Sequence, residues 1–373
     1  MKARRPVAIL IAIAAVVGMA VTSALAARVA GPVPIKNSKT LGLTRGPAGE
    51  KATPTSALRL SAKEVAKVRK GHYTAALVWH QTSDFENAVT SGARDQFNKL
   101  GIKIVATTIA NFDAGKQKSD VETVMAKKPS VMLTLPVDPV ATASAYKAAA
   151  KAGTKIVLLS NVPKGFKYGR DYVSLVTDDL FQMGKHAADA LAAGIGGQGE
   201  VAYFFHDANY YVTNQRDQAF LKTIRGNYKG IQVVDKTGIA DPNKATDQAN
   251  ATLLKNPDLN GIYVTFSQPP AEGVLSALRS NGNKGAKLVS LDLDEPLALD
   301  MARGGNVFAI VADKAYELGQ SMAKAAAYGI LHKKAPSFIV APAITVTKAN
   351  LVKGYRDSLH KAPPRSVLDA LKK

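Results

Sequence analysis

The chain has 373 residues, of which 46% are hydrophobic and 21% are charged, so it is long enough for two lobes and has the composition of a soluble globular protein. It contains no cysteine, which excludes disulfides, thiolate metal sites, a cysteine nucleophile and a lipid-modified N-terminal cysteine. The formal net charge of +20 raises the question of nucleic acid, but the lysines are dispersed and no DNA- or RNA-binding motif is present. We therefore expect no nucleic-acid partner and interpret the charge as a solvated surface suited to an anionic cell envelope.

Residues 1–26 are predicted to be a secretory signal peptide. Lys2, Arg4 and Arg5 precede an apolar run from Val7 to Val21, and Ala24-Leu25-Ala26 then supplies a cleavage site of the small-x-small type. An uncleaved membrane anchor is the alternative, but the apolar run has about 15 residues and a membrane span needs about 20. No later stretch is a candidate span, so we expect a periplasmic or secreted protein that keeps a charge of +17 after cleavage.

Residues 27–71 are predicted to be a flexible linker that ends in a short helix. The segment up to about residue 58 is rich in Gly, Pro, Ser, Thr and Lys and has few large apolar side chains. The helix is expected over Leu60–Lys70, because Ser61 and Glu64 have the spacing of a capping box.

From Tyr73 onward the chain alternates between predicted strands and predicted helices, in two successive runs. The predicted strands are Thr74–His80, Ile102–Ile109, Val131–Leu135, Lys155–Leu159, Asp171–Thr177, Glu200–Phe205, Gln232–Lys236, Gly261–Phe266, Lys287–Leu291 and Val307–Val311. The predicted helices are Asp84–Leu100, Lys116–Lys127, Ala141–Ala152, Asp179–Ala193, Asn214–Arg225, Lys244–Lys255, Ala271–Asn281, Glu295–Met301 and Tyr316–Leu331. The strands are continuous apolar runs, which is typical of parallel strands covered by helices on both faces. The sequence thus predicts an α/β protein with two doubly wound parallel-sheet lobes.

The C-terminal segment, Ala349–Lys373, is expected to cap the second lobe. Its Pro363-Pro364 pair should separate two short helices, because proline cannot continue a helix.

Polar and aromatic side chains follow nearly every predicted strand, at the edge where open parallel sheets bind ligands. Carboxylates and amides bind neighbouring sugar hydroxyls, and aromatic faces cover the apolar side of a sugar ring, so this mixture indicates a small polar ligand. The candidate ligand-binding residues are Trp79, His80, Ser83, Asp84, Phe85, Asp138, Ser160, Asn161, His206, Asp207, Asn209, Tyr210, Arg216, Ser267, Gln268, Asp292 and Asp313.

Some of these side chains have an alternative role. Asp84, Asp138 and Asp179 each stand where an aspartate caps the helix that follows. Two others are harder to explain structurally: Asp292 interrupts the end of an apolar strand, and Arg216 enters a helix start, where the helix dipole disfavours a cation.

At these positions the sequence resembles the ribose-binding branch of the type 1 periplasmic sugar-binding proteins, from roughly Tyr73 to Val346. The resemblance matches Phe85 to an aromatic residue that stacks on the sugar, and Ser83 to a polar ligand position. Six further residues fall at the family's binding positions: Ser160 and Asn161, Arg216 four residues before Phe220, Ser267, Asp292 in Ser290-Leu291-Asp292, and Asp313.

The chain also departs from that pattern. Glu86 replaces the second aromatic residue of the first loop, Ser160-Asn161 replaces an Asp-Arg pair, and Ala240 replaces an aromatic residue. The chain adds aromatic and imidazole side chains at Trp79, His80, His206, Tyr210 and Tyr211. The resemblance therefore implies the scaffold, with a sugar other than ribose, a polyol or another oxygen-rich solute as the ligand.

The resemblance implies an extracytoplasmic solute-binding protein that delivers a monosaccharide or polyol to the permease of an ABC transporter. It implies a monomer without a cofactor, whose lobes are joined by a hinge that the chain crosses three times. The lobes expected on this basis are residues 72–177 with 311–334, and residues 178–310 with 335–373. A sensor that presents its ligand to a chemoreceptor, and a binder of a non-sugar polar solute, remain alternatives.

Other classes of protein are disfavoured. The sequence has no nucleophile elbow, P-loop or metal-binding helix, so we expect that the protein is not an enzyme. The glycine-rich run 194–199 precedes a strand instead of following one, which disfavours a dinucleotide site. His80 and His206, with Asp207 nearby, are the one combination considered for a metal, and we expect none there. A transcription regulator of the same fold needs an N-terminal DNA-binding headpiece, where this chain has a signal peptide and a linker.

Overall fold

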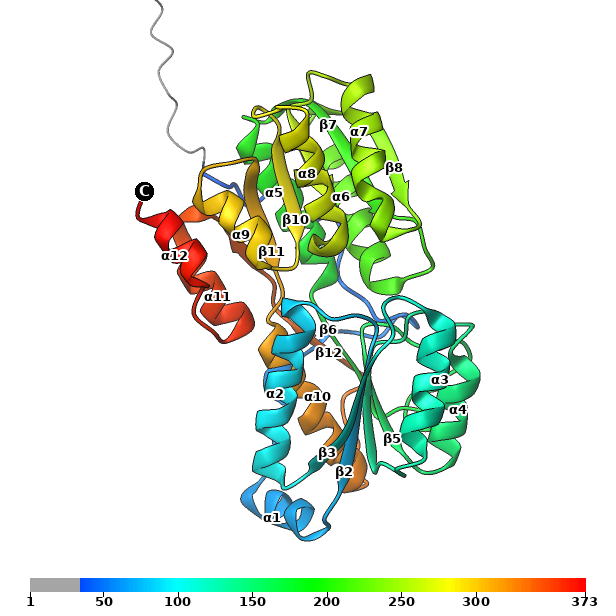
Figure 1. The fold of residues 1–373 in the computed structure, drawn as a ribbon. Helices are drawn as coiled ribbons and strands as arrows, with labels where there is room; N and C mark the ends of the chain where they lie inside the picture. The colour runs from blue at the N-terminus through cyan, green and yellow to red at the C-terminus, as the bar shows by residue number, and fades with distance from the viewer. Residues whose placement is uncertain (1–33) are drawn as a thin grey trace, which may run out of the picture. The chain divides into compact units, whose positions relative to one another are not determined.

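The computed structural model describes residues 34–373, which form two α/β lobes (Figure 1). The predicted signal peptide, residues 1–26, lies outside the described residues, as do residues 27–33 of the predicted linker. Within residues 34–373, no helix is both long enough and apolar enough to cross a membrane.

The first lobe contains a seven-stranded sheet in the order β1-β12-β6-β5-β4-β2-β3. Every neighbouring pair in this sheet is parallel. Its strands are β1 (Thr53–Pro54), β12 (Phe338–Ala341), β6 (Ser174–Asp178), β5 (Lys155–Leu159), β4 (Val131–Thr134), β2 (Thr74–Trp79) and β3 (Lys103–Ile109). The inner strands β2, β4, β5 and β6 are buried except for the first residue of β2 and of β5, which explains their continuous apolar sequences.

Helices cover both faces of this sheet. Figure 1 shows α2 (Asp84–Leu100) and α10 (Ala315–Ile330) on one side, and α3 (Ala114–Met125) and α4 (Ala143–Lys151) on the other. The short helix α1 (Ala62–Lys70) packs against α2. The predicted capping box of α1 is confirmed, since the Ser61 hydroxyl accepts from the Glu64 N–H and the Glu64 carboxylate accepts from the Ser61 N–H.

The second lobe contains a six-stranded sheet in the order β13-β11-β10-β9-β7-β8, in which only β13 is antiparallel to its neighbour. Its strands are β13 (Ile344–Val346), β11 (Val307–Ala312), β10 (Lys287–Leu291), β9 (Gly261–Val264), β7 (Gln198–His206) and β8 (Gly230–Ile239). Its helices are α5 (Leu180–Gly194), α6 (Tyr211–Asn227), α7 (Ala245–Lys255), α8 (Glu272–Ser280) and α9 (Glu295–Ala302). Helix α5 packs along α6 and against β9, β10 and β11, whereas α7 packs on α8.

The chain passes between the two sheets three times. The passages lie between β6 and α5, between β11 and α10, and between β12 and β13. One boundary differs from the prediction: Phe338–Ala341, assigned to the second lobe from the sequence, is β12 and pairs with β6 of the first sheet. This four-residue strand is short and follows proline and serine, so the sequence pattern did not mark it as a strand.

The prediction of a flexible linker is wrong for residues 34–58. Asn37 accepts a hydrogen bond from Lys185 of α5 (2.7 Å), and the Thr44 hydroxyl donates to Asp179 and accepts from the Phe181 N–H. Farther on, β1 adds to the edge of the first sheet and Leu58 is buried. The segment is ordered by hydrogen bonds from polar side chains. It therefore shows no regular spacing of apolar residues that would have predicted its structure.

The C-terminal helices are α11 (Leu351–Leu359) and α12 (Arg365–Leu371), and Pro363-Pro364 separates them as predicted. Helix α12 packs on α9 of the second lobe, but α11 also contacts α2 and α10 of the first lobe. Lys361, between the two helices, forms an ion pair with Asp84 at the start of α2 (2.6 Å). The segment therefore contacts both lobes instead of capping only the second.

Two glycines set the distance between α2 and α10. A Cβ atom on Gly92 would lie 2.0 Å from the carbonyl oxygen of Tyr316, and one on Gly319 would lie 1.9 Å from that of Val89. Both distances are far below van der Waals contact, so the two helices pack backbone against backbone at this crossing.

We expect Gly319→Ala to lower the free energy of unfolding by about 1–3 kcal/mol, because the added methyl group forces α2 and α10 apart. Urea unfolding followed by circular dichroism measures this change. Gly115→Ala is the control, since the only non-neighbouring atom near its Cβ is the Asp113 carboxylate at 3.2 Å. Equal urea midpoints for the two variants would contradict the close packing of α2 against α10.

Candidate functional site

A pocket lies where the carboxyl ends of the two sets of parallel strands meet. Its cavity volume is about 40 Å³, within an atom-free space of about 520 Å³. Part of this space is open to solvent. Both lobes contribute to its lining: His80, Gln81, Ser83, Phe85, Glu86, Phe112, Leu135, Ser160, Asp178, Tyr210, Val212, Thr213, Arg216, Phe266, Ser267, Gln268, Asp292 and Asp313. This is the edge at which open parallel sheets bind ligands.

Helix α6 places Arg216 at this cavity. Phe220, one helical turn farther on, is fully buried and stacks on Tyr263 with ring centroids 3.9 Å apart. The neighbouring Asp217 accepts from the His206 N–H (2.9 Å), the Tyr263 hydroxyl (2.7 Å) and the Thr265 hydroxyl (3.0 Å). These contacts fix the rotation of α6, so its start is held against the ends of β7 and β9.

The guanidinium of Arg216 is only 4% exposed, and carboxylates surround it. It lies 2.7 Å from Asp292 and 4.0 Å from Asp313, and it donates to the Thr265 carbonyl (3.2 Å). Burial opposes the charge, but the two carboxylates outweigh burial and raise the pKa of Arg216. Its Nε–H has no hydrogen-bond partner among the described residues, so one donor remains for a ligand.

Two strand ends use backbone angles that side chains rarely adopt. Asp292 follows β10 with φ 68°, and Ser160 follows β5 with φ 55°. Non-glycine residues in this left-handed region cluster at functional sites. Here the left-handed backbone turns the chain at the end of each strand, so that the side chains of Asp292 and Ser160 line the cavity.

Asp178 and Asp313 form a second acidic group beside Arg216. Burial raises the pKa of Asp178 to about 7, and burial and the Asp178 charge raise the pKa of Asp313 well above its ordinary value. One oxygen of Asp178 has no hydrogen-bond partner among residues 34–373. Two carboxyl groups in this state present both an acceptor and a donor to a hydroxyl-bearing ligand.

A third polar group comes from the loop after β2. The Ser83 hydroxyl donates to the Glu86 carboxyl group, and the Nε2 atom of His80 lies 3.2 Å from the other Glu86 oxygen. Burial raises the pKa of Glu86 to about 8 and lowers the pKa of His80 to about 3. Both shifts favour the uncharged forms, and the Nδ1 atom of His80 has no hydrogen-bond partner among the described residues.

Aromatic rings cover the same end of the cavity. Phe112 lies edge-on to His80, with ring centroids 5.1 Å apart, and within 6.4 Å of Tyr210. Phe266 lies 6.0 Å from Phe112 and 5.5 Å from His206. The Tyr210 hydroxyl is buried and lacks a partner among the described residues. The cavity thus combines apolar ring faces with polar groups in the way that small-molecule sites do.

Ten of the predicted site residues line the cavity, although their contact with a ligand stays a prediction. They are His80, Ser83, Phe85, Ser160, Tyr210, Arg216, Ser267, Gln268, Asp292 and Asp313. Two more are buried beside it: His206 contacts the rings of Tyr210 and Phe266, and Asn161 accepts from the Val212 N–H across the lobes (3.3 Å).

The other five predicted residues are placed elsewhere. Trp79 is buried in the core and donates from Nε1 to the Thr90 hydroxyl (2.9 Å), so it does not lie in the cleft as predicted. Asp84 pairs with Lys361, and Asp138 accepts the N–H groups of Val140 and Ala141 in a turn. Asp207 and Asn209 are exposed and are not part of the cavity lining.

Sequence reasoning missed Phe112, Glu86 and Asp178 as cavity residues. Phe112 follows β3 and Asp178 ends β6, so the strand-end rule would have found both had it been applied to every strand. Glu86 was noted only as a departure from the family pattern. Among residues 34–373, no group of three or more His, Asp or Glu side chains is arranged to hold a metal ion.

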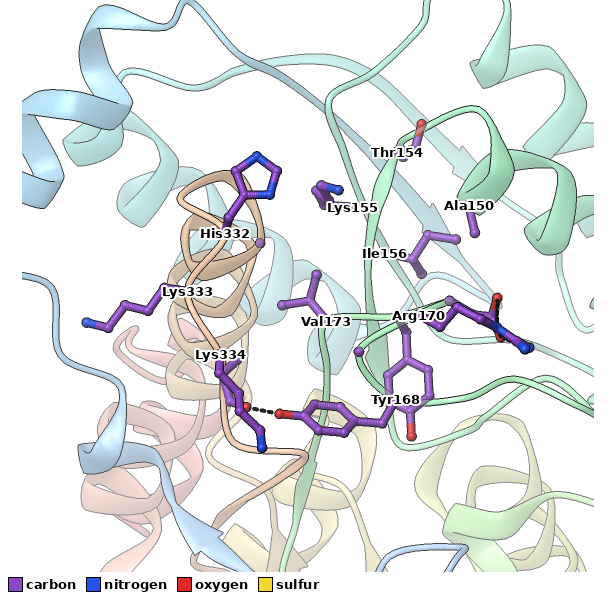
Figure 2. Close-up of a pocket in the computed structure, with 15 residues that line it drawn as sticks. Ala150, Thr154, Lys155, Ile156, Tyr168, Arg170, Val173, His332, Lys333 and Lys334 are labelled. Atoms are coloured by element: carbon purple, nitrogen blue, oxygen red, sulfur yellow. Dashed lines mark hydrogen bonds and ion pairs between the residues drawn. The ribbon is translucent and has the colours of Figure 1, made fainter.

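A larger pocket, with a cavity volume of about 530 Å³, lies at the opposite edge of the first lobe (Figure 2). It is lined by residues from the turns before β5, β6 and β12, among them Lys155, Tyr168 and Lys334. It lies at the amino ends of the strands, and its buried polar side chains, Thr154 and Asp171, already form hydrogen bonds within the protein.

The family model "Periplasmic binding protein domain" matches residues 75–334, which is most of the chain. The chain belongs to this family. A curated relative, the ribose import binding protein of Bacillus subtilis, is 26% identical over 257 residues, covering 68% of this chain and 80% of the relative. The ABC transporter periplasmic-binding protein YphF of Escherichia coli is 23% identical over 266 residues, covering 69% of this chain and 80% of the relative.

Solved structures share the fold. A solute-binding protein of Agrobacterium vitis, bound with α-D-tagatopyranose, matches with a TM-score of 0.70 at 23% identity and covers 78% of this chain and all of its own. A carbohydrate transporter solute-binding protein of Agrobacterium radiobacter, in complex with D-arabinose, matches with a TM-score of 0.68 at 24% identity and covers 78% of this chain and 99% of its own. This periplasmic binding protein therefore has the two-lobed fold of its family.

Trp79 gives a direct test of the site boundary. Because its indole ring is packed in the core, we expect a blue-shifted emission that a saturating ligand leaves unchanged in wavelength, and we expect Trp79→Phe to keep the wild-type affinity. Fluorescence titration and calorimetry measure the two effects. A loss of affinity of tenfold or more in a folded Trp79→Phe variant would contradict this placement and indicate that Trp79 contributes to ligand binding.

Glu86 gives a pH test. An acid whose pKa is raised from 4.5 to about 8 on folding loses stability as the pH rises through that interval, because the folded state holds the proton longer. We expect Glu86→Gln to gain stability relative to the wild type between pH 5 and 9, by up to about 4 kcal/mol. Denaturant midpoints at a series of pH values measure this difference, and parallel curves for the two proteins would contradict it.

Proposed function

We propose that this protein is an exported solute-binding protein that captures a monosaccharide or polyol between its lobes and delivers it to the permease of an ABC transporter. The observation that carries the proposal is a set of buried polar atoms at the cavity that have no partner within residues 34–373: the Nε of Arg216, the Nδ1 of His80, the hydroxyl of Tyr210 and an oxygen of Asp178. These donors and acceptors come from both lobes, and a polyhydroxyl ligand satisfies both kinds.

The relatives support the same ligand class. One curated relative is a ribose import binding protein, and solved relatives hold D-arabinose, tagatopyranose and D-allose. Ser160 and Asn161 replace the Asp-Arg pair of the ribose-binding branch, and Glu86 replaces an aromatic residue. For this reason the proposed ligand is a sugar or polyol other than ribose.

The proposed mechanism is a shift of population between open and closed arrangements of the lobes. A ligand that makes hydrogen bonds to both lobes binds the closed arrangement more tightly, so binding favours closure. The three passages of the chain between the sheets are the segments that would act as the hinge. No bond is made or broken, and the cavity residues serve as binding groups only.

A thermal-shift screen of the purified protein against sugars, polyols, sugar acids and amino acids tests the ligand class. A ligand that binds only the native state raises the melting temperature with concentration. We expect hits confined to neutral sugars or polyols. Hits confined to amino acids or other non-sugar solutes would overturn the sugar assignment and leave the fold untouched.

Asp292→Asn tests the site itself. The substitution keeps the shape of the side chain but removes the charge that orients Arg216, so we expect a loss of affinity of at least tenfold for the hit, measured by calorimetry. Asp207→Asn is the matched control, since Asp207 follows β7 yet is exposed outside the cavity. Equal affinities for the two variants would contradict the placement of the site. Arg216→Ala is less suited, because it leaves buried carboxylates without a cation and is expected to impair folding.

A further inference from the structure

The turns at the amino ends of the first sheet gather on one surface, opposite the cavity edge. Hydrogen bonds join them: the Lys155 N–H donates to the Ser130 carbonyl (2.9 Å), the Leu175 N–H to the Ser337 carbonyl (3.0 Å), and the Tyr168 hydroxyl to the Ala335 carbonyl. Helix α1 lies beside them, since Arg69 donates to the Lys99 carbonyl (2.9 Å). Figure 1 shows α1 at this end of the lobe, remote from the second lobe.

This surface is densely basic, and we name it the basal surface. Its fourteen lysines and arginines are Lys63, Lys67, Arg69, Lys70, Lys99, Lys103, Lys127, Lys128, Lys151, Lys155, Lys167, Arg170, Lys333 and Lys334. All are exposed except Lys155, which is half-buried. The same segments hold only two acidic residues, and both are already paired: Glu64 with Lys333 (2.8 Å) and Asp171 with Arg170 (2.7 Å).

The equivalent edge of the second lobe serves as an internal comparison. The turns before its parallel strands, with the helix ends that enter them, carry seven basic residues, Arg225, Lys229, Lys255, Arg279, Lys284, Lys287 and Arg303, with Asp258 among them. The corresponding segments of the first lobe carry ten, and helix α1 adds the other four. Helix C-termini lie at both edges, and cations there stabilise the helix dipoles. Because that stabilisation is needed at both edges, it does not explain the greater charge of the basal surface.

The basal surface is also hollowed. The pocket of about 530 Å³ is bordered by Lys155, Arg170, His332, Lys333 and Lys334. Figure 2 shows these basic side chains around it. The large hydrophobic side chains that are exposed among residues 34–373 are Leu43, Val140 and Leu254, and none belongs to this surface. A partner held here is therefore bound by charge and not by apolar insertion.

We propose that the basal surface binds the anionic phospholipid headgroups of a membrane. The cations come from six turns and a helix and spread over the whole end of the lobe, which fits a planar charged surface better than a single strand of polymer. Lysines and arginines within a Debye length of an anionic bilayer attract the protein to it. The chain has no cysteine to carry a lipid anchor, and this contact leaves the cavity edge free.

The test is co-sedimentation of the purified protein with vesicles of phosphatidylglycerol and phosphatidylcholine, at about 0.1 M and about 1 M salt, where the Debye length falls from about 10 Å to about 3 Å. We expect binding at low salt, release at high salt, and no binding to phosphatidylcholine alone. A variant with four basal lysines replaced (Lys67→Gln, Lys99→Gln, Lys151→Gln, Lys334→Gln) should bind at least tenfold more weakly.

The matched control replaces four exposed lysines of the second lobe (Lys222→Gln, Lys236→Gln, Lys244→Gln, Lys284→Gln), which changes the net charge equally. We expect this variant to bind like the wild type, and thermal midpoints report that both variants are folded. An equal loss in both variants would overturn the assignment to this surface. Absence of binding to anionic vesicles, with retention on soluble polyphosphate, would overturn the membrane as partner.

Discussion

The buried guanidinium of Arg216 is the interaction on which the candidate site depends. Removing such a cation from water costs several kcal/mol unless carboxylates and further acceptors surround it. Asp292, Asp313 and the carbonyl of Thr265 supply that surrounding, and each belongs to the end of a different strand. Arg216 therefore requires β9, β10 and β11 to end at one place, while Phe220 and Asp217 hold α6 at the correct rotation. The contacts of Arg216 thus determine both the arrangement of the strand ends and the charge of the cavity.

Within the described part of the chain, the same arrangement leaves polar atoms without partners on both lobes. A buried donor or acceptor without a partner costs about 1–3 kcal/mol, whereas a hydrogen bond from a ligand hydroxyl removes that cost. Because Arg216 and Tyr210 belong to the second lobe and His80 and Asp178 to the first, a single small ligand relieves the cost on both sides together. In the proposed mechanism, ligand recognition and lobe closure are therefore one event. The basal surface, at the far edge of the first lobe, is separate from this event.

Much of the fold follows from the sequence, because buried parallel strands are continuous apolar runs and their helices have a regular period. The ends of β5, β10 and α2 agree with their predicted positions to the residue. The predictions that were wrong share a common cause. Residues 34–58 and β12 are held by hydrogen bonds to distant parts of the chain, and a local pattern does not report such contacts. Trp79 was misplaced for a related reason, since only the packed structure shows that its ring points toward Thr90. Asp292 and Arg216 were identified because each violates a local rule, and a violated rule is visible in sequence alone.

The most direct test of the account is the distance between the lobes with and without ligand. The chain lacks cysteine, so spin labels are attached cleanly at Val140→Cys and Asn243→Cys, two exposed positions at the cavity edges of the first and second lobes. Double electron–electron resonance then reports the distribution of distances. The account predicts that a saturating sugar or polyol shifts the population toward the shorter distance, and that Asp292→Asn prevents the shift at the same ligand concentration. A ligand that binds tightly but leaves the distribution unchanged would contradict binding across the two lobes.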